Sequence, residues 1–444
     1  MISRRNILMT GAALGGAAIL AGRDQALAQS QPQQPGNAPA GAAARPGRAA
    51  PARAATGQPG SVITPNGASL PWKVVDGVKV FHLIAEPVVR EMAPGLTVHC
   101  WGYNGHTPGP TIEVVDGDRC RFYVTNKLSE ETSVHWHGVL LPNGMDGVSG
   151  VTQKPIRPGE TFRYEFTFTK PGTFMYHPHF DEMTQIALGM TGMIVVHPRV
   201  RRETRRVRDY ALMLHEWRIP AGTARPDPLE MIDFNVLTFN SKAFPGTAPL
   251  VAEVGDLVRI RLGNLSPMEH HPIHLHGHAF RVVETDGGPV PRSAQWPETT
   301  VLVPTGSVRV IEFVADAPGD WPFHCHMTHH IMNQMGHDFP NMIGVNVDGL
   351  DARMARQIPG YMTMGHTGMG GMGAMGMPSP RNSIPMVGAP GPFGHIDMGG
   401  MFTLLKVRER LAGDGDPGWY QHPAGTVSET ATQDELRRDG IEIG

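Results

Sequence analysis

The stretch PGDWPFHCH, Pro318–His326, repeats the pattern of an earlier stretch, PGTFMYHPH, at Pro171–His179. Upstream, GDLVRIRLGN at Gly255–Asn264 likewise repeats GDRCRFYVTN at Gly117–Asn126. HWHG follows the earlier of these two decapeptides, and HLHG follows the later one. Because three segments recur in the same order, we infer that one structural unit is used twice along the chain.

The pattern of residues in each copy of this unit is typical of a β-sandwich. Short runs rich in β-branched and aromatic residues, such as LTVHCWGY, FRYEFTF and MIVVHP, are separated by Gly, Pro and Asn turns. The chain of 444 residues carries 54 glycines and 40 prolines with only 18% charged residues, which is typical of turn-rich β structure. We predict an all-β protein with two tandem Greek-key sandwiches, at residues 70–200 and 205–350.

Residues 1–28 have the features of an export signal. The pair Arg4-Arg5 precedes an apolar run from Ile7 to Leu20, and an Ala-Leu-Ala sequence follows. The apolar run is rich in Gly and Ala and too short to span a membrane well. We predict a twin-arginine signal peptide, and hence a periplasmic or secreted protein without stable membrane insertion.

The remaining segments differ from the sandwiches in composition. Residues 29–69 are mostly Pro, Ala, Gly and Gln, which predicts a disordered linker. Residues 351–444 form a tail that contains a Met/Gly-rich stretch, GYMTMGHTGMGGMGAMGMPSP, whose thioethers suit Cu(I) but whose composition also fits a solvated linker. We expect the apolar piece MFTLLKVRERL to dock back on the body. The net charge of -3 gives no reason to expect nucleic acid as a partner.

Four H-x-H pairs stand at matched places in the two copies of the unit. They are His135/His137, His177/His179, His274/His276 and His324/His326. Residues two apart on a β-strand point the same way, so each pair presents two imidazoles on one face. A single pair is weak evidence, because histidines also occur on strands as ordinary polar residues. Four pairs at matched places in two repeats indicate metal ligands.

The same alternation predicts a second site. Cys325 lies between the two histidines of one pair and must point the opposite way, into its own sandwich. His271, three residues before another pair, shares that opposite parity, while His330 and Met335 follow where the chain can curl back. A thiolate, two imidazoles and a more distant thioether form the ligand set of a blue-copper centre. Zinc is the alternative for a Cys/His cluster, but zinc sites rarely use Met.

These motifs resemble those of a known family. HWHG, HPH, HPIHLHGH and HCHMTHHIMNQM are similar to the four copper-binding motifs of the multicopper oxidases, laccase-like proteins built from cupredoxin domains. The resemblance covers roughly residues 75–347 and implies that both sandwiches are cupredoxin-like. It implies a type 1 copper held by His271, Cys325 and His330, with Met335 as the axial ligand. It further implies a type 2 copper bound by His135 and His274, and a type 3 pair bound by His137, His177, His179, His276, His324 and His326.

The resemblance also implies a reaction. Electrons from a phenolic, aromatic or low-valent metal donor enter at the type 1 copper, and O2 is reduced to water at the cluster of three coppers. Asp146 resembles the family acid near the type 2 copper that helps protons reach reduced oxygen, although an Asp-Gly turn is the simpler interpretation. Thr328-His329 stand where many members carry an acidic residue, which is a departure from the family's proton relay.

The spacing of the motifs bears on assembly. The segment between His179 and His271 is too short to hold a third domain. Two-domain relatives close the copper cluster between neighbouring chains of a ring. The resemblance therefore implies a homotrimer in which domain 1 of one chain meets domain 2 of the next.

Several alternatives stay open on the sequence alone. A cuprous or other metal oxidase serving copper tolerance would give the Met-rich stretch a purpose. A copper nitrite reductase would carry its type 1 cysteine in domain 1, where this chain has Pro178 between two histidines. A non-catalytic copper-storage protein would not need all eight cluster histidines. Cys100 and Cys120 are either two buried thiols or, in an oxidising compartment, a disulfide.

Overall fold

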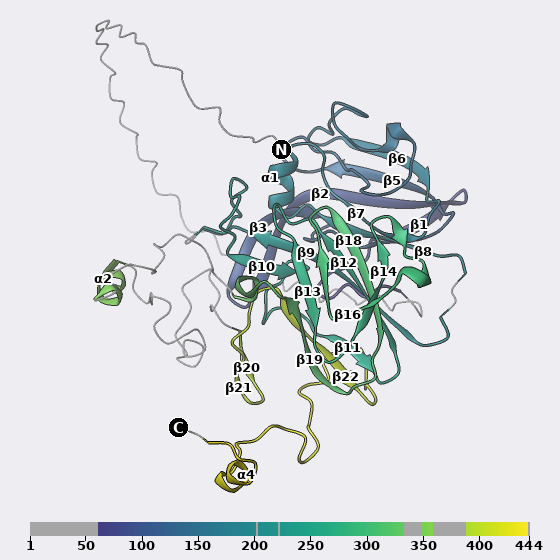
Figure 1. Cartoon of the computed structure of the whole chain (residues 1–444). Coiled ribbons are helices and arrows are strands. Elements are labelled where there is room, and N and C mark those ends of the chain that lie inside the picture. Colours follow the sequence, from purple (N-terminus) through teal and green to yellow (C-terminus); the bar gives the residue numbers. More distant parts are fainter. Residues whose placement is uncertain (1–60, 201–202, 221–222, 333–348, 358–387, 443–444) are drawn as a thin grey trace, which may run out of the picture. The chain divides into compact units, whose positions relative to one another are not determined.

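Figure 1 shows a computed structural model that describes residues 61–200, 203–220, 223–332, 349–357 and 388–442. Strands make up most of the regular structure, and the helices α1 (Glu182–Ala187), α2 (Leu350–Gln357) and α4 (Gln433–Arg438) are short. Among these residues, no helix is long and apolar enough to cross a membrane. The prediction of an all-β protein is confirmed.

The first sandwich contains eight strands in two sheets. They are β1 (Trp72–Val75), β2 (Val78–Ala93), β3 (Leu96–Tyr103), β4 (Ile112–Val115), β5 (Arg119–Asn126), β6 (Thr161–Thr167), β7 (Gly172–Tyr176) and β8 (Gly192–His197). One sheet has the order β1-β2-β5-β6, with β3 also paired to β2, and the other has the order β4-β8-β7. The core between them includes the buried rings of Phe122, Trp136 and Tyr176.

The second sandwich follows the same plan with more strands. They are β9 (Val207–Trp217), β10 (Val236–Phe239), β11 (Leu250–Glu253), β12 (Leu257–Asn264), β13 (His271–Leu275), β14 (Phe280–Thr285), β15 (Gly288–Pro289), β16 (Pro297–Glu298), β17 (Thr300–Val303), β18 (Ser307–Val314), β19 (Gly319–Cys325) and β22 (Phe402–Arg408). One sheet has the order β10-β9-β12-β18-β14-β15, with β16 on β14. The other has the order β11-β22-β19-β13-β17.

The two sandwiches repeat the same strand pairing. β2 runs parallel to β5 with Ala85 opposite Asn126, and β9 runs parallel to β12 with Leu214 opposite Asn264. β5 and β12 lie within the two decapeptides whose likeness indicated the repeat. The two copies can therefore be compared residue by residue.

The end of the predicted linker requires a correction, because residues 61–69 are packed. Val62 is buried, and its backbone N–H donates to the Glu113 carboxylate of β4 over 3.0 Å. Ile63 forms a β-bridge with Tyr210 of β9. Because Glu113 belongs to the first sandwich and Tyr210 to the second, this segment contacts both sandwiches. The rest of the predicted linker and the predicted signal peptide lie outside the described residues.

The predicted end of the second sandwich at residue 350 also requires a correction. β22 lies in the middle of a sheet, parallel to β11 and antiparallel to β19, with Phe402 opposite His324. The piece MFTLLKVRERL therefore docks on the body, as we expected, and completes the second sandwich. The Met/Gly-rich stretch that precedes it lies outside the described residues.

Cys100 and Cys120 are both free and buried. Cys100 packs with Met92 and Trp217 in a cluster drawn from both sandwiches, whereas Cys120 belongs to the core of the first sandwich. Burial raises the pKa of each thiol to about 12. Of the two interpretations left open by the sequence, the structure has the pair of buried thiols.

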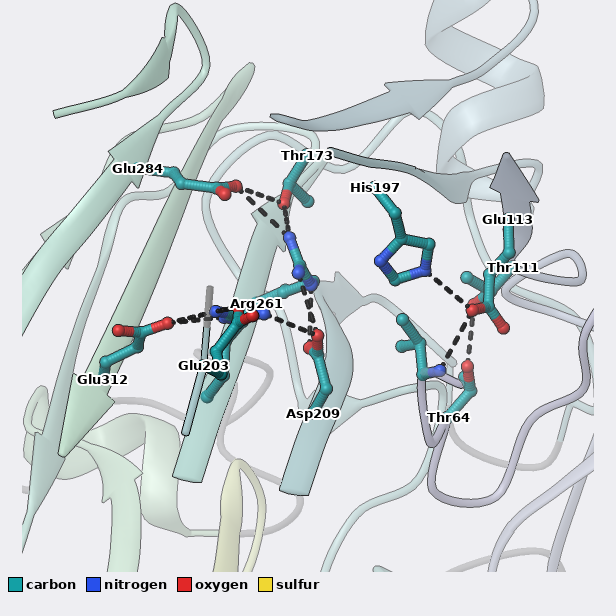
Figure 2. A network of polar contacts seen from close by, with 12 residues as sticks. Thr64, Thr111, Glu113, Thr173, His197, Glu203, Asp209, Arg261, Glu284 and Glu312 are labelled. Atoms are coloured by element: carbon teal, nitrogen blue, oxygen red, sulfur yellow. Dashed lines mark hydrogen bonds and ion pairs between the residues drawn. The ribbon is translucent and has the colours of Figure 1, made fainter. Parts of the chain in front are cut away.

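A buried ionic contact joins the two sandwiches (Figure 2). Arg261 of β12 makes two hydrogen bonds to the Asp209 carboxylate of β9, over 2.8 and 2.9 Å. Its third nitrogen donates to the hydroxyl of Thr173, on β7 of the first sandwich, over 2.5 Å. Burial alone would raise the pKa of Asp209, but Arg261 and Arg259 hold it below its ordinary value. The contact is therefore a paired charge that fixes the second sandwich against β7.

We expect Arg261→Met to lower the free energy of unfolding by about 3 kcal/mol, because the buried Asp209 carboxylate loses both hydrogen bonds from Arg261 and keeps only Arg259, at 3.3 Å, as a charged partner. The double variant Arg261→Met/Asp209→Leu should regain most of that loss. Urea unfolding of the apoprotein measures both. Arg309→Met is the control, since its partly exposed pair with Asp286 contributes less than about 1 kcal/mol. Equal effects of the two single variants would contradict this expectation.

Candidate metal centres

Three side chains with soft or borderline metal donors meet inside the second sandwich. Cys325 ends β19, His271 begins β13, and His330 lies in the 3-10 helix η3 (Thr328–Ile331). The Cys325 Sγ lies 3.5 Å from His330 Nδ1 and 3.8 Å from His271 Nδ1, and the two Nδ1 atoms lie 3.2 Å apart. All three residues are buried. We call this group the thiolate site; its donor atoms converge on one point, as a bound metal ion requires.

Polar neighbours orient both imidazoles of the thiolate site. The Nε2 atom of His271 bonds to the Ser266 hydroxyl over 2.7 Å, and Nε2 of His330 is paired with the Glu269 carboxylate. Both Nδ1 atoms are thereby left facing Cys325. Such outer partners fix the tautomer and strengthen the imidazole as a ligand.

Burial determines the protonation of Cys325 and His271 in the thiolate site. Burial raises the pKa of Cys325 to about 12 and lowers the pKa of His271 well below its ordinary value. The metal-free site therefore holds a thiol and a neutral imidazole at neutral pH. A copper ion would need to displace one proton, from sulfur.

The predicted axial ligand is not among these groups. Met335 lies outside the described residues, so its role stays a prediction. Met332, the next methionine upstream, directly follows η3.

Four histidines gather on the first sandwich, and we call them the first quartet. They are His135, His137, His177 and His179. The ring of His135 lies 5.3 to 5.6 Å from the other three ring centroids. The Nδ1 atom of His137 is 3.2 Å from Nε2 of His177. The structure therefore brings together all four residues that the sequence predicted here.

The second sandwich carries a matching group, the second quartet. It consists of His274, His276, His324 and His326. His274 is central here as His135 is in the first quartet, with ring centroids 4.8 to 5.6 Å from the other three. Nε2 of His276 lies 3.1 Å from Nε2 of His324. The strand pairing of β13 with β19, which places His274 opposite His324, produces this arrangement.

Matched hydrogen bonds orient corresponding imidazoles in the two quartets. The Nδ1–H of His177 donates to the Pro178 carbonyl over 2.8 Å, and that of His324 donates to the Cys325 carbonyl over 2.7 Å. The Nδ1–H groups of the two central histidines also donate to carbonyls, over 2.8 Å in each case. In all four rings Nε2 remains available as a metal ligand.

Carboxylates lie beside the quartet histidines. Asp146 Oδ1 is 3.4 Å from His135 Nδ1, which is where the sequence predicted an acidic residue. Glu182 lies 3.5 Å from His177 and 3.7 Å from His179, and we did not predict it. Its position three residues after His179, at the start of α1, is the signal that could have indicated it. Glu269, next to His330, was missed because the two residues are far apart in sequence.

The two quartets are separate within one chain. Among the residues that the structure describes, no ring contact or hydrogen bond links a histidine of the first quartet to one of the second. Each group thus offers four imidazoles that its own chain does not bring to the other four.

Comparison with known proteins agrees with this arrangement. Two family models, both described as multicopper oxidase, match residues 86–201 and 221–344. The solved structure of the multicopper oxidase mgLAC is 26% identical, with a TM-score of 0.55, and the match covers 79% of this chain and 91% of that one. The blue copper oxidase from Nitrosomonas europaea is 25% identical with a TM-score of 0.55, covering 82% of this chain and 95% of that one.

A curated relative matches over a shorter stretch. Dihydrogeodin oxidase from Aspergillus terreus is 32% identical over 242 residues, which is 49% of this chain and 38% of that protein. The chain spans less than half the length of the curated relatives that it matches. Because the two family matches together span more than half of the chain, the chain belongs to the multicopper oxidase family. It contains two cupredoxin-like sandwiches, and copper is the metal that its thiolate site and quartets fit.

Replacing the thiolate should remove one copper centre selectively. We expect copper-loaded Cys325→Ser to lose the intense visible absorption that arises from a copper–thiolate bond, because a hydroxyl cannot replace the sulfur as a soft ligand. Visible absorption and copper content per chain measure the change. Cys120→Ala removes a buried thiol elsewhere and should keep the band. Retention of the band in Cys325→Ser would mean that another thiol binds the metal.

Burial lowers the pKa of His177 to about 3, so this ring stays neutral in the folded protein through mild acid. In the unfolded chain it titrates near about 6.5. Between these values the unfolded state binds a proton that the folded state does not bind, so acid should destabilise the apoprotein as the pH falls from about 6.5 towards 3. We expect His177→Asn to reduce this loss of melting temperature between about pH 7 and 4. Parallel melting curves for the two proteins would refute the assignment.

Proposed function

We propose that this protein is a laccase-like multicopper oxidase, which couples four one-electron oxidations of a donor to the reduction of one O2, with four protons, to two waters. The observation that carries the proposal is the position of Cys325. Its side chain belongs to the thiolate site, while His324 and His326 on either side belong to the second quartet. When bound, copper supplies one-electron transfer at the thiolate site and multi-electron reduction of O2 at the quartets.

The donor sets support one assignment of the copper ions. In this proposal the thiolate site holds the type 1 copper, with Met335 as its axial ligand. The central histidines of the quartets, His135 and His274, hold the type 2 copper. The remaining six quartet residues hold the type 3 pair: His137, His177, His179, His276, His324 and His326.

The backbone of β19 supplies the electron route in this proposal. From Cys325 Sγ the chain reaches either neighbouring histidine through a few covalent bonds. The hydrogen bond from His324 Nδ1 to the Cys325 carbonyl, at 2.7 Å, provides a second connection. Because Cys325 and His324 are neighbours on one strand, the spacing between the thiolate site and this residue of the second quartet does not depend on any loop.

Asp146 is the proposed proton carrier for the oxygen-side site. Its carboxylate is near His135, and its side chain is 30% exposed, so it can exchange protons with solvent. A carboxylate in this position can accept a proton from water and pass it inward.

We propose that the two quartets are completed between chains, in a homotrimer. Large apolar side chains that are exposed on the single chain lie close in sequence to both groups. Leu140 and Met183, 65% and 60% exposed, follow His137 and His179 within a few residues, and Met327 directly follows His326. Exposed apolar side chains of this kind mark surfaces that are covered in an assembly. Closed ring symmetry would place the first quartet of one chain against the second quartet of the next.

Export and the donor belong to the same proposal. The twin-arginine signal predicted from the sequence would deliver the folded, metal-loaded protein to the periplasm or the exterior. A phenol, an aromatic amine or a low-valent metal ion such as Cu(I) would serve as donor. The Met/Gly-rich stretch favours Cu(I) through its thioethers.

Oxygen uptake by the copper-loaded mature protein tests the function. With Cu(I) and a methoxyphenol offered separately, we expect consumption of one O2 for every four donor molecules oxidised and no release of hydrogen peroxide. Faster turnover of Cu(I) would identify a cuprous oxidase, and faster turnover of the phenol a laccase. Absence of oxygen uptake with both donors, in protein that retains the blue band, would refute the proposal.

A charged side chain introduced at the proposed interface should prevent trimer assembly and leave the thiolate site intact. We expect Leu140→Asp to yield monomers by sedimentation and to lose oxygen reduction, while the visible band of Cys325 remains. Val74→Asp is the matched control, because Val74 is similarly exposed (59%) on β1, a strand without quartet histidines. A wild-type protein that is monomeric yet fully active would contradict the proposed assembly.

A further inference from the structure

Glu216 is a carboxyl group buried beside the thiolate site that the proposed mechanism does not use. It lies on β9 and is 0% exposed. Its Oε1 atom accepts two backbone hydrogen bonds, from Met268 over 2.7 Å and from Glu269 over 3.0 Å. The carboxyl therefore holds the loop formed by residues 265–270, which enters the thiolate site at His271.

This loop carries the outer partners of both imidazoles of the thiolate site. Ser266 bonds to His271, and the Glu269 carboxylate pairs with Nε2 of His330. Two other side chains also anchor the loop. Asn264 donates to the Glu269 carbonyl over 2.9 Å and accepts from the Ser266 N–H over 2.8 Å, and the Thr305 hydroxyl donates to the Glu269 carbonyl over 2.8 Å. Glu216 differs from them because it accepts from the N–H groups at the end of the loop that precedes His271.

The first sandwich supplies an internal comparison. There Asn126 plays the part of Asn264: its side chain donates to the Glu130 carbonyl over 2.7 Å and accepts from the Leu128 N–H over 2.9 Å. The equivalent strand pairing places Ala85 opposite Asn126, as Leu214 is opposite Asn264. Two residues further along, Pro87 is therefore the counterpart of Glu216.

Pro87 has no side-chain acceptor, and its sandwich lacks a thiolate site among the described residues. The asparagine anchor is thus common to both copies, whereas the carboxyl anchor occurs only where the loop supports metal ligands. The need to hold the loop does not by itself explain the Glu216 carboxyl, because the first sandwich holds its corresponding loop without a carboxyl at this position.

A buried carboxyl is also costly, which argues for a specific purpose. Removing a polar group from water costs free energy unless hydrogen bonds replace those lost. Burial, together with the nearby Glu269 carboxylate, raises the pKa of Glu216 to about 8, so the group is mostly protonated at neutral pH. A neutral acceptor is sufficient to hold two N–H groups.

We propose that Glu216 is a positioning residue of the type 1 centre: it holds residues 265–270 so that the Glu269 carboxylate stays on His330, and it thereby sets the reduction potential of that centre. This inference rests on the proposed function. A carboxylate on the far nitrogen makes an imidazole a stronger donor to its metal. Stronger donation favours Cu(II) over Cu(I), so release of Glu269 should raise the potential.

The test compares Glu216→Gln with Glu216→Leu in the copper-loaded full-length protein. Glutamine keeps the neutral oxygen acceptor, so we expect the wild-type potential, visible band and copper EPR spectrum. Leucine fills the space without an acceptor, so we expect a higher potential and an altered EPR spectrum. Potentiometric titration of the visible band supplies the first readout, independently of oxygen turnover.

Glu230→Leu is the matched control. Glu230 also caps a loop, its Oε1 accepting from the N–H groups of Met231, Ile232 and Asp233, each over 2.8 Å. No hydrogen bond connects that loop to the thiolate site among those the structure gives. We expect Glu230→Leu to leave the type 1 potential unchanged, although it removes a comparable anchor.

Glu269→Gln alters the same contact and leaves Glu216 in place, so the inference stays falsifiable if Glu216→Leu folds poorly. Glu269→Gln should raise the potential directly, and adding Glu216→Leu should then have little further effect, because both act through the same contact. Additive shifts of the reduction potential, or a wild-type potential in Glu216→Leu, would overturn this inference but not the proposed function. A wild-type protein without the blue band would overturn the proposed function as well.

Discussion

The alternation of side chains along a single strand is the constraint on which both candidate metal centres depend. On β19 the thiol of Cys325 must face the interior because His324 and His326 face outward. The pairing of β19 with β13 then brings His274 opposite His324 and leaves His271 at the strand end beside the sulfur. Two sites with different chemistry are therefore held at a fixed spacing by backbone hydrogen bonds. Cys325 and His324, which belong to the two sites, cannot move apart without breaking the sheet.

Duplication explains why one chain carries two such quartets and only one thiolate site. The pairing of His135 with His177 in the first copy, and of His274 with His324 in the second, gives each sandwich a matching set of four imidazoles. In the first copy Pro178 replaces the cysteine, and its carbonyl keeps the hydrogen bond to the preceding histidine. Both copies therefore keep a quartet of histidines, but only the second copy has a thiolate site.

Much of the fold and most of the candidate site could be predicted from the sequence because they depend on local periodicity. The parity of His271, Cys325 and the four H-x-H pairs is a property of neighbouring residues, and the structure brings these residues together as predicted. The packing of residues 61–69 and the place of β22 could not be predicted in this way. Residues 61–69 have few large apolar side chains. β22 is apolar, which predicted that it docks on the body, but its partner strands lie far away in sequence. Glu269 and Glu216 were missed for the same reason: each acts on a residue of another element.

The place of β22 has a consequence for how the protein is made. This strand pairs with β19 along one edge and with β11 along the other, yet a long excursion of the chain separates it from β19. During translation, the strand that carries Cys325 emerges from the ribosome well before its neighbour is synthesised. Until residues 402–408 appear, β19 has an open edge and the sheet has a gap at its centre. The sheet that carries the thiolate site can therefore close only after residues 402–408 have been synthesised, so the site takes its final form well after its own ligands leave the ribosome.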